Sequence, residues 1–268
     1  MPALQVNLLA YFCRITIFMI HRYFIKKVRE RTGSQIFFGP FATLRIPEEL
    51  FPHLTIGEMI GTYESCLHGV INELIVQRPQ SVVIIGANNG YYCAGLAYTM
   101  RPQRLLAFEM VPRLHPIARS WWECNDLPPM DLQGEATPEV LRNIQAPVDL
   151  LICDCEGAEE ELLQPEAYTW QKDASIIVEL HDFYRPGLTQ RLVERFSESH
   201  DIRLLQDDPQ ELELNDKILG AVHPSYWLTR FKIPLFPAHR WIQNGKHQML
   251  TAGKFLYLCP KAKRASQS

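Results

Sequence analysis

The sequence predicts an α/β fold in which a mostly parallel sheet of seven strands carries helices on both faces. Short apolar, β-branched runs alternate with stretches of helical periodicity from about Leu67 to Leu205, and no internal repeat or low-complexity tract interrupts them. The first run, SVVII, closes at Gly86, as a strand entering a turn does. A chain of 268 residues, 47% of them hydrophobic, is long enough to bury the core that such a sheet needs.

The predicted elements follow in order along the chain. Apolar residues at helical spacing, β-branched content and the positions of proline and glycine set their limits. The expected strands are Ser81 to Ile85, Arg104 to Phe108, Met130 to Gln133, Val148 to Cys153, Ala174 to Leu180, Ile202 to Leu205 and Gly253 to Cys259. The expected helices are Thr55 to Gln77, Tyr91 to Met100, Pro112 to Glu123 and Leu188 to Ser199, with Glu159 to Glu161 as the polar first turn of another.

Three regions are expected: an apolar, helical extension over residues 1–54, the sheet-bearing core over 55–206, and a proline- and aromatic-rich cap over 207–268 that returns the last strand to the sheet. The aromatic residues of the cap are predicted to pack against the core, and an acceptor pocket is the alternative. The cap contains Tyr226, Trp227, Phe231, Phe236 and Trp241, and this prediction concerns all of them except Phe236. The same two interpretations apply to the pair Trp121 and Trp122.

The amino-terminal stretch from Leu8 to Ile20 is apolar except for Arg14 and Thr16, and a basic segment follows it. Thirteen residues are too few for a helix to span a bilayer of about 30 Å. Two interpretations stay open: a helix packed on protein, or an interfacial helix whose basic tail meets anionic lipid. We therefore expect a cytoplasmic protein with possible peripheral membrane contact through this segment.

Charge and cysteine usage narrow the class of protein. A net charge of -3 gives no electrostatic reason to expect a nucleic-acid partner. The seven cysteines contain no C-x-x-C pair, which indicates reduced thiols in a cytosolic protein. Cys153 and Cys155 are expected to be small buried residues with no metal or redox role.

Glycine and polar residues follow four of the expected strands, where an open parallel sheet binds its ligands. Gly86 and Gly90 frame the turn after the first strand, and Glu109 ends the second strand, 19 residues after Gly90, where an acid can accept hydrogen bonds from ribose hydroxyls. The other strand ends carry Gly134 and Glu135, Asp154 and Glu156, and Glu179 and His181. A dinucleotide fingerprint would need glycine at positions 88 and 91, which are Asn88 and Tyr91, so NAD is disfavoured.

The segments IIGANNGYYCAGLA, LLAFEM, LICDCEGAEEELL and IIVELHD resemble those of FkbM-type and related class I S-adenosylmethionine-dependent methyltransferases, from about Gly61 to Phe196. The resemblance implies a Rossmann-like class I methyltransferase fold, S-adenosylmethionine as cofactor and, in many members, transfer to oxygen. It implies that Asp154 faces the reaction site and also touches the cofactor. The cofactor residues that it implies are Gly86, Ala87, Asn88, Gly90, Tyr91, Tyr92, Glu109, Met110, Gly134 and Glu135.

One position departs from the pattern. Members of this fold usually carry an acidic residue two positions before the first loop glycine, and here that position is Ile84. The acid normally organises the amino-acid end of the cofactor. Its absence implies weaker binding, a substitute such as Asp154, or a chain that has lost catalysis.

A hydroxyl acceptor requires a base, for which Asp154, Glu156 and His181 are the candidates. His181 is equally well explained by a structural hydrogen bond. A divalent metal shared by Asp154, Glu156, His181 and Asp182 is an alternative, but nothing in the sequence sets its geometry, so no metal is predicted.

The expected function is methylation of a small-molecule or glycan acceptor. A catalytically silent scaffold with the same fold and a nicotinamide-dependent oxidoreductase are the alternatives. The sequence does not indicate the acceptor or the oligomeric state.

Overall fold

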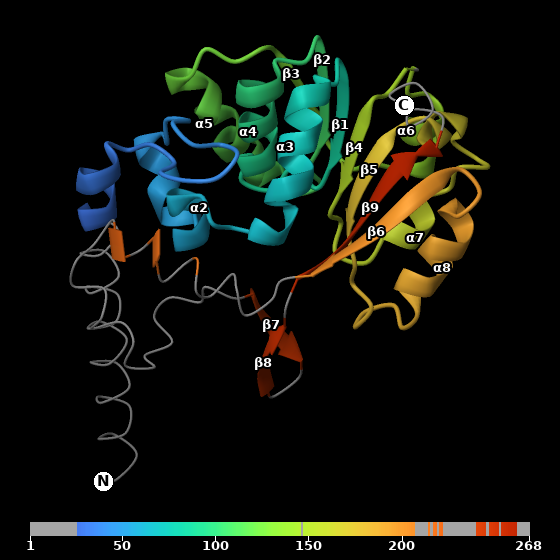
Figure 1. Cartoon of the computed structure of the whole chain (residues 1–268). Helices are drawn as coiled ribbons and strands as arrows, with labels where there is room; N and C mark the ends of the chain where they lie inside the picture. The colour runs from blue at the N-terminus through green and yellow to red at the C-terminus, as the bar shows by residue number, and fades with distance from the viewer. Residues whose placement is uncertain are drawn as a thin grey trace, which may run out of the picture.

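The computed structural model describes residues 26–145, 147–206, 214, 217–218, 220–221, 240–244, 247–251 and 253–261. Seven strands form one sheet in the order β3-β2-β1-β4-β5-β9-β6, and only β9 runs antiparallel to its neighbours β5 and β6 (Figure 1). The strands are β1 (Ser81–Ile85), β2 (Arg104–Phe108), β3 (Met130–Gln133), β4 (Leu150–Cys153), β5 (Ser175–Glu179), β6 (His200–Gln206) and β9 (Lys254–Pro260). The predicted Rossmann-like, mostly parallel sheet of seven strands is confirmed.

Helices cover both faces of the sheet, as Figure 1 shows. Side chains alternate along β1, so Val82 and Ile84 join one hydrophobic cluster while Val83 and Ile85 join the other. The first cluster packs against α3 (His68–Gln77), α4 (Tyr91–Met100) and α5 (His115–Cys124). The second packs against α6 (Pro138–Arg142), α7 (Glu159–Leu162) and α8 (Leu188–Phe196). The central strands β1, β4 and β5 are buried on both faces and are therefore largely apolar rather than alternating, whereas the edge strands β3 and β6 carry polar, exposed residues.

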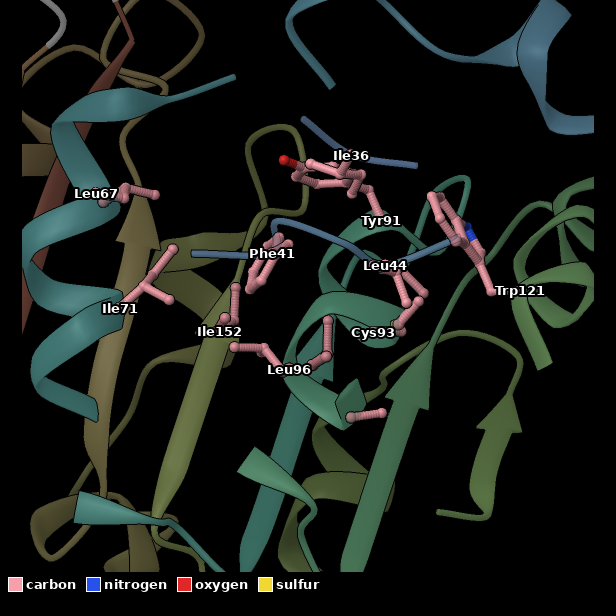
Figure 2. Packing of buried hydrophobic residues seen from close by; sticks show 14 of the residues in the cluster. Ile36, Phe41, Leu44, Leu67, Ile71, Tyr91, Cys93, Leu96, Trp121 and Ile152 are labelled. Carbon is pink, nitrogen blue, oxygen red and sulfur yellow. The ribbon is translucent and has the colours of Figure 1, made fainter. Parts of the chain in front are cut away.

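The segment before the sheet belongs to the same core. Ile36, Phe41 and Leu44 are buried in the first cluster, where Figure 2 shows them with Tyr91 and Trp121. The ring of Phe41 meets that of Tyr91 edge-on with centroids 5.3 Å apart. Residues 36–44 therefore pack against the amino-terminal end of α4.

The predicted helix from Thr55 to Gln77 is wrong in its middle. The chain forms α2 (Ile56–Ile60), a break, a 3-10 turn η2 (Ser65–Leu67) and then α3. Gly61 caps α2 with φ 79°, and a side chain there would overlap the carbonyl oxygen of Phe38. Glu64 follows in the left-handed region with φ 50°. Packing against the preceding segment outweighs the helical periodicity here.

The other elements lie close to their predicted bounds. The helix expected from Pro112 begins with a 3-10 turn, η3 (Pro112–Leu114), and continues as α5. Further short elements are η1 (Glu48–His53), η4 (Thr169–Lys172) and a separate hairpin of β7 (Arg240–Asn244) and β8 (His247–Thr251). The stretch from Leu8 to Ile20 and the aromatic residues 226, 227, 231 and 236 lie outside the described residues. No helix in the described part of the chain has the length and apolar character that crossing a membrane requires.

Candidate active site at the carboxyl ends of the strands

The parallel strands end level with one another, which gathers their following residues. Ile85 pairs with Phe108 on one side and with Cys153 on the other, and Cys153 pairs with Val178. The loops after β1, β2, β4 and β5 therefore share one edge of the sheet. This edge brings together most of the polar residues that the sequence singled out.

The turn after β1 needs its glycines for the protein's own packing. Gly86 has φ 90°, and a side chain there would overlap the backbone oxygen of Asp154. Gly90 has φ 84°, and a β-carbon there would lie 2.8 Å from the α-carbon of Ala118. Both positions also exclude L side chains conformationally. The glycines keep the turn close to β4 and α5, which adds a structural requirement to the predicted cofactor role.

Asn89, which the sequence interpretation missed, anchors this turn. Its amide nitrogen donates to Glu58 Oε1 at 2.7 Å, and its Oδ1 accepts from the backbone N–H of Tyr91 at 3.0 Å. The indole N–H of Trp121 donates to the Asn89 carbonyl at 3.0 Å. Trp121 is fully buried, as predicted for core packing. In the sequence, the role of Asn89 was indicated only by its being a polar residue inside a glycine turn. Its partners Glu58 and Trp121 lie 31 and 32 positions away in the chain.

Glu109 fastens the turn to the end of β2. Its Oε2 accepts from the N–H of Asn88 at 2.7 Å, and its Oε1 accepts from the N–H of Val111 at 2.8 Å. Each carboxylate oxygen can accept a second hydrogen bond. Glu109 is thus held rigidly at the predicted position with capacity left for two hydroxyl donors.

Some of the remaining predicted cofactor residues are exposed to solvent and others are buried. Met110 is 69% exposed, and Gly134 and Glu135 are exposed in the loop after β3. Ala87 and Tyr91 are buried, and the Tyr91 ring lies within the core, so its side chain is closed off from a ligand.

A pocket opens on the α3 and α4 side of these strand ends. Apolar residues form much of its wall, and the ionisable side chains that line it are three carboxylic acids, one tyrosine and one thiol. The lining residues are Glu64, Leu67, Ile84, Gly86, Tyr92, Ile152, Cys153, Asp154, Ile177, Glu179 and Phe255. The pocket is therefore suited to a ligand that is partly apolar and carries positive charge.

Glu64 was not predicted as a site residue. It is buried, lines the pocket with Ile84, and accepts a hydrogen bond from the Tyr92 hydroxyl. Its position before α3, 20 residues ahead of Ile84, offers no motif from which the contact could have been read. The acid missing at Ile84 thus has a counterpart in the same pocket.

His181 lies among four carboxylates beside the pocket. Its Nδ1 is 2.5 Å from Glu159 Oε1, and its Nε2 is 3.4 Å from Glu156 Oε2. Nε2 is also 3.9 Å from Asp154 Oδ1 and 3.7 Å from Glu179 Oε1. The three predicted catalytic residues, Asp154, Glu156 and His181, therefore do meet.

The cluster shifts the pKa values of its members. Burial raises the pKa of Asp154 to about 7; the His181 imidazole opposes the rise, and Glu156 and Glu159 add to it. Burial disfavours the charged form of His181, but its bond to Glu159 and the nearby carboxylates outweigh burial and raise its pKa. Burial likewise works against the charge on Glu159, and its bond with His181 prevails, so its pKa is lowered.

Two other acidic residues of these loops serve the structure. Asp182 accepts from the backbone N–H of Thr189 at 3.0 Å and from Lys254 Nζ at 3.0 Å, away from His181. Glu160 holds Arg191 with contacts of 2.6 and 2.9 Å, as a surface residue of α7. The predicted polar first turn thus contains Glu160, whereas Glu159 is turned inward to His181.

No protein-family model matches this sequence, and the comparison with curated proteins gives no match. Solved structures of similar fold include an O-methyltransferase from Bacillus cereus in complex with SAH, at 15% identity over 70% of this chain and 77% of that one, with a TM-score of 0.40. Another is precorrin-6y C5,15-methyltransferase from Geobacter metallireducens, at 11% identity over 70% and 86%, with a TM-score of 0.41. Cofactor-bound Rv0187 from MTB matches at 15% identity over 77% and 82%, with a TM-score of 0.47. Likeness at this level concerns the fold and leaves substrate and activity open.

Proposed function

We propose that this chain is an S-adenosylmethionine-dependent methyltransferase that methylates an oxygen of a small-molecule or glycan acceptor. The motifs at its strand ends, which resemble those of FkbM-type enzymes, support this proposal. The observation that carries the proposal is the charge of the pocket: Glu64, Asp154 and Glu179 line it, and no lysine or arginine does. A pyrophosphate cofactor would meet repulsion there, whereas S-adenosylmethionine carries a sulfonium and an ammonium group. The same charge pattern weighs against the nicotinamide alternative.

The residues fit this cofactor at each end. Glu109 would accept the ribose hydroxyls with its remaining lone pairs, and the open loop at Gly134 and Glu135 would lie near the adenine. Glu64 would receive the ammonium group in place of the acid that Ile84 lacks. The apolar wall from Ile152 and Ile177 would enclose the region around the sulfur.

When bound, the cofactor supplies an electrophilic methyl group. The chain's own residues hold the acceptor oxygen in line with it and exclude water, which is the main requirement of such a displacement. Asp154 lies between the pocket and His181, and its pKa near 7 lets it exchange a proton at neutral pH. We therefore assign proton acceptance to the cluster of Asp154, Glu156 and His181.

The test is formation of S-adenosylhomocysteine from S-adenosylmethionine in the presence of hydroxyl-bearing metabolite and oligosaccharide fractions. We expect acceptor-dependent product that disappears in Glu109→Ala and falls strongly in Asp154→Asn. Cofactor binding without turnover over all fractions would favour the silent scaffold. Absence of both binding and turnover would reject the proposal.

A further inference from the structure

His181 is oriented by a fully buried partner. Glu159 is 0% exposed, and its Oε1 accepts the backbone N–H of Gly157 at 3.1 Å as well as contacting His181 Nδ1 at 2.5 Å. A carboxylate that already accepts an N–H is an acceptor toward the imidazole too, so Nδ1 carries the proton. The bond sets the tautomer and turns Nε2 away from Glu159.

The atom that faces outward from this bond, His181 Nε2, has carboxylates around it. The side chain of His181 is only 4% exposed, and Nε2 lies 3.4 Å from Glu156 Oε2 and 3.9 Å from Asp154 Oδ1. Asp154 Oδ1 is itself buried and without a hydrogen-bond partner in the described chain. This buried oxygen lies 3.9 Å from Nε2, beyond hydrogen-bond distance. A buried polar atom without a partner is costly unless something else binds there.

The spacing of these atoms suits a shared cation. His181 Nε2, Asp154 Oδ1 and a carboxylate oxygen of Glu156 lie within 4.8 Å of one another. Two ligands at about 2.1 Å from one ion are about 3.0 Å apart when adjacent and about 4.2 Å apart when opposite. The separations of Nε2 from Glu156 Oε2, 3.4 Å, and from Asp154 Oδ1, 3.9 Å, fall between these limits.

We propose that Asp154, Glu156 and His181 form a divalent-cation site of the Mn²⁺ type, with Glu159 as the positioning residue that presents His181 Nε2 to the ion. Two carboxylates and one imidazole make a mixed oxygen and nitrogen ligand set that Mn²⁺ accepts, and water or an acceptor oxygen completes the coordination. Asp182 is not part of this site because Thr189 and Lys254 hold its carboxylate.

Charge favours the same conclusion. The ion pairs of Asp154, Glu156 and Glu159 among the described residues all go to the one imidazole of His181, which carries at most a single positive charge. The cluster is therefore strongly negative even with that histidine protonated. A divalent ion offsets this repulsion in a way that a proton on His181 does not.

The site adjoins the pocket because Asp154 belongs to both. Its use in catalysis rests on the proposed function: an ion here would ligate a hydroxyl or diol oxygen of the acceptor and lower the pKa of that hydroxyl. With the ion bound, His181 Nε2 would be a ligand, and the carboxylate oxygens of Asp154 and Glu156 that do not ligate the ion would accept the proton. Ion binding itself does not depend on the cofactor.

The experiment titrates MnCl₂ into the chelator-treated full chain without cofactor, followed by calorimetry and by loss of the free Mn²⁺ paramagnetic signal. We expect one site per chain and an affinity at least about tenfold weaker in Glu156→Gln and in Asp154→Asn. Glu156 is 75% exposed at its side chain, so its isosteric variant is expected to fold. Glu161→Gln, on the neighbouring α7, is the matched control and should bind as the unaltered protein does.

No binding at about 1 mM Mn²⁺, or binding that both variants leave unchanged, would overturn the site; the second result would identify an adventitious surface ion only. S-adenosylhomocysteine is titrated into the same metal-free samples. Cofactor binding without an ion site would reject this inference alone, and an ion site without cofactor binding would reject the proposed function alone.

Discussion

Replacing Gly86 by alanine is expected to disturb the junction of β1 with both of its neighbours. The added methyl group would overlap the backbone oxygen of Asp154, and φ 90° is a conformation that alanine rarely adopts. Relief requires the turn to move away from β4. That movement stretches the bond from Asp154 N to Ile85 O, now 2.9 Å, and the bond from Gly86 N to Phe108 O, now 3.0 Å.

The size of the effect follows from these contacts. A left-handed alanine costs about 1–2 kcal/mol, each weakened backbone hydrogen bond about 1 kcal/mol, and the forced displacement about 1–3 kcal/mol. The free energy of unfolding should fall by about 4–7 kcal/mol in total. For a chain of this size that lowers Tm by on the order of 10–20 °C.

Urea unfolding followed by tryptophan fluorescence measures the change. The control is Gly134→Ala, because a β-carbon there meets nothing within 4 Å and its φ is not positive. It should change the unfolding free energy by less than about 0.5 kcal/mol. If Gly86→Ala were within about 1 kcal/mol of the unaltered protein, the close approach of Gly86 to Asp154 would be refuted.

Two further predictions concern residues ahead of the sheet. Glu64→Gln should weaken S-adenosylhomocysteine binding about 5- to 30-fold, as measured by calorimetry. The substitution removes the negative charge opposite the ammonium group, while the amide oxygen of glutamine still accepts a hydrogen bond from Tyr92. Unchanged affinity would remove Glu64 from the cofactor site. Burial lowers the pKa of His68 from 6.5 to about 4, against the backbone bond to Tyr63, so the unfolded chain binds this proton first as pH falls. As the pH falls from about 6.5 to 4, His68 should therefore lower the free energy of unfolding by up to about 3 kcal/mol, and the His68→Gln protein should not show this part of the loss. Chemical denaturation at several pH values measures the change. The same pH dependence of the unfolding free energy in both proteins would contradict the prediction.

The sheet could be predicted because its signals are local. After Ser81 and Arg104, the remaining residues of β1 and β2 are apolar on both faces, and glycine or glutamate follows each run, so their limits agree with the structure. The break between α2 and α3 could not be predicted in this way. It depends on Phe38, which approaches Gly61 across 23 positions of sequence.

The site, like the fold, could be predicted where its signals are local and not where they depend on distant segments. Glu109, Asp154 and His181 stand at strand ends, so topology alone gathers them. Glu159 looked like an ordinary acidic helix start, and its inward position depends on a contact with His181, 22 positions away in the sequence. Glu64 and Asn89 reach the site through contacts between distant segments, which no spacing within a motif encodes.

Titration of S-adenosylhomocysteine into the purified chain tests the central claim most directly. We expect calorimetry to show one site per chain, an affinity at least about tenfold weaker in Glu109→Ala, and no change in Glu161→Ala, with unfolding measured on each variant to confirm that it is folded at the assay temperature. No heat at millimolar ligand, or equal affinity in Glu109→Ala, would contradict the assignment of a cofactor site to the ends of β1 and β2.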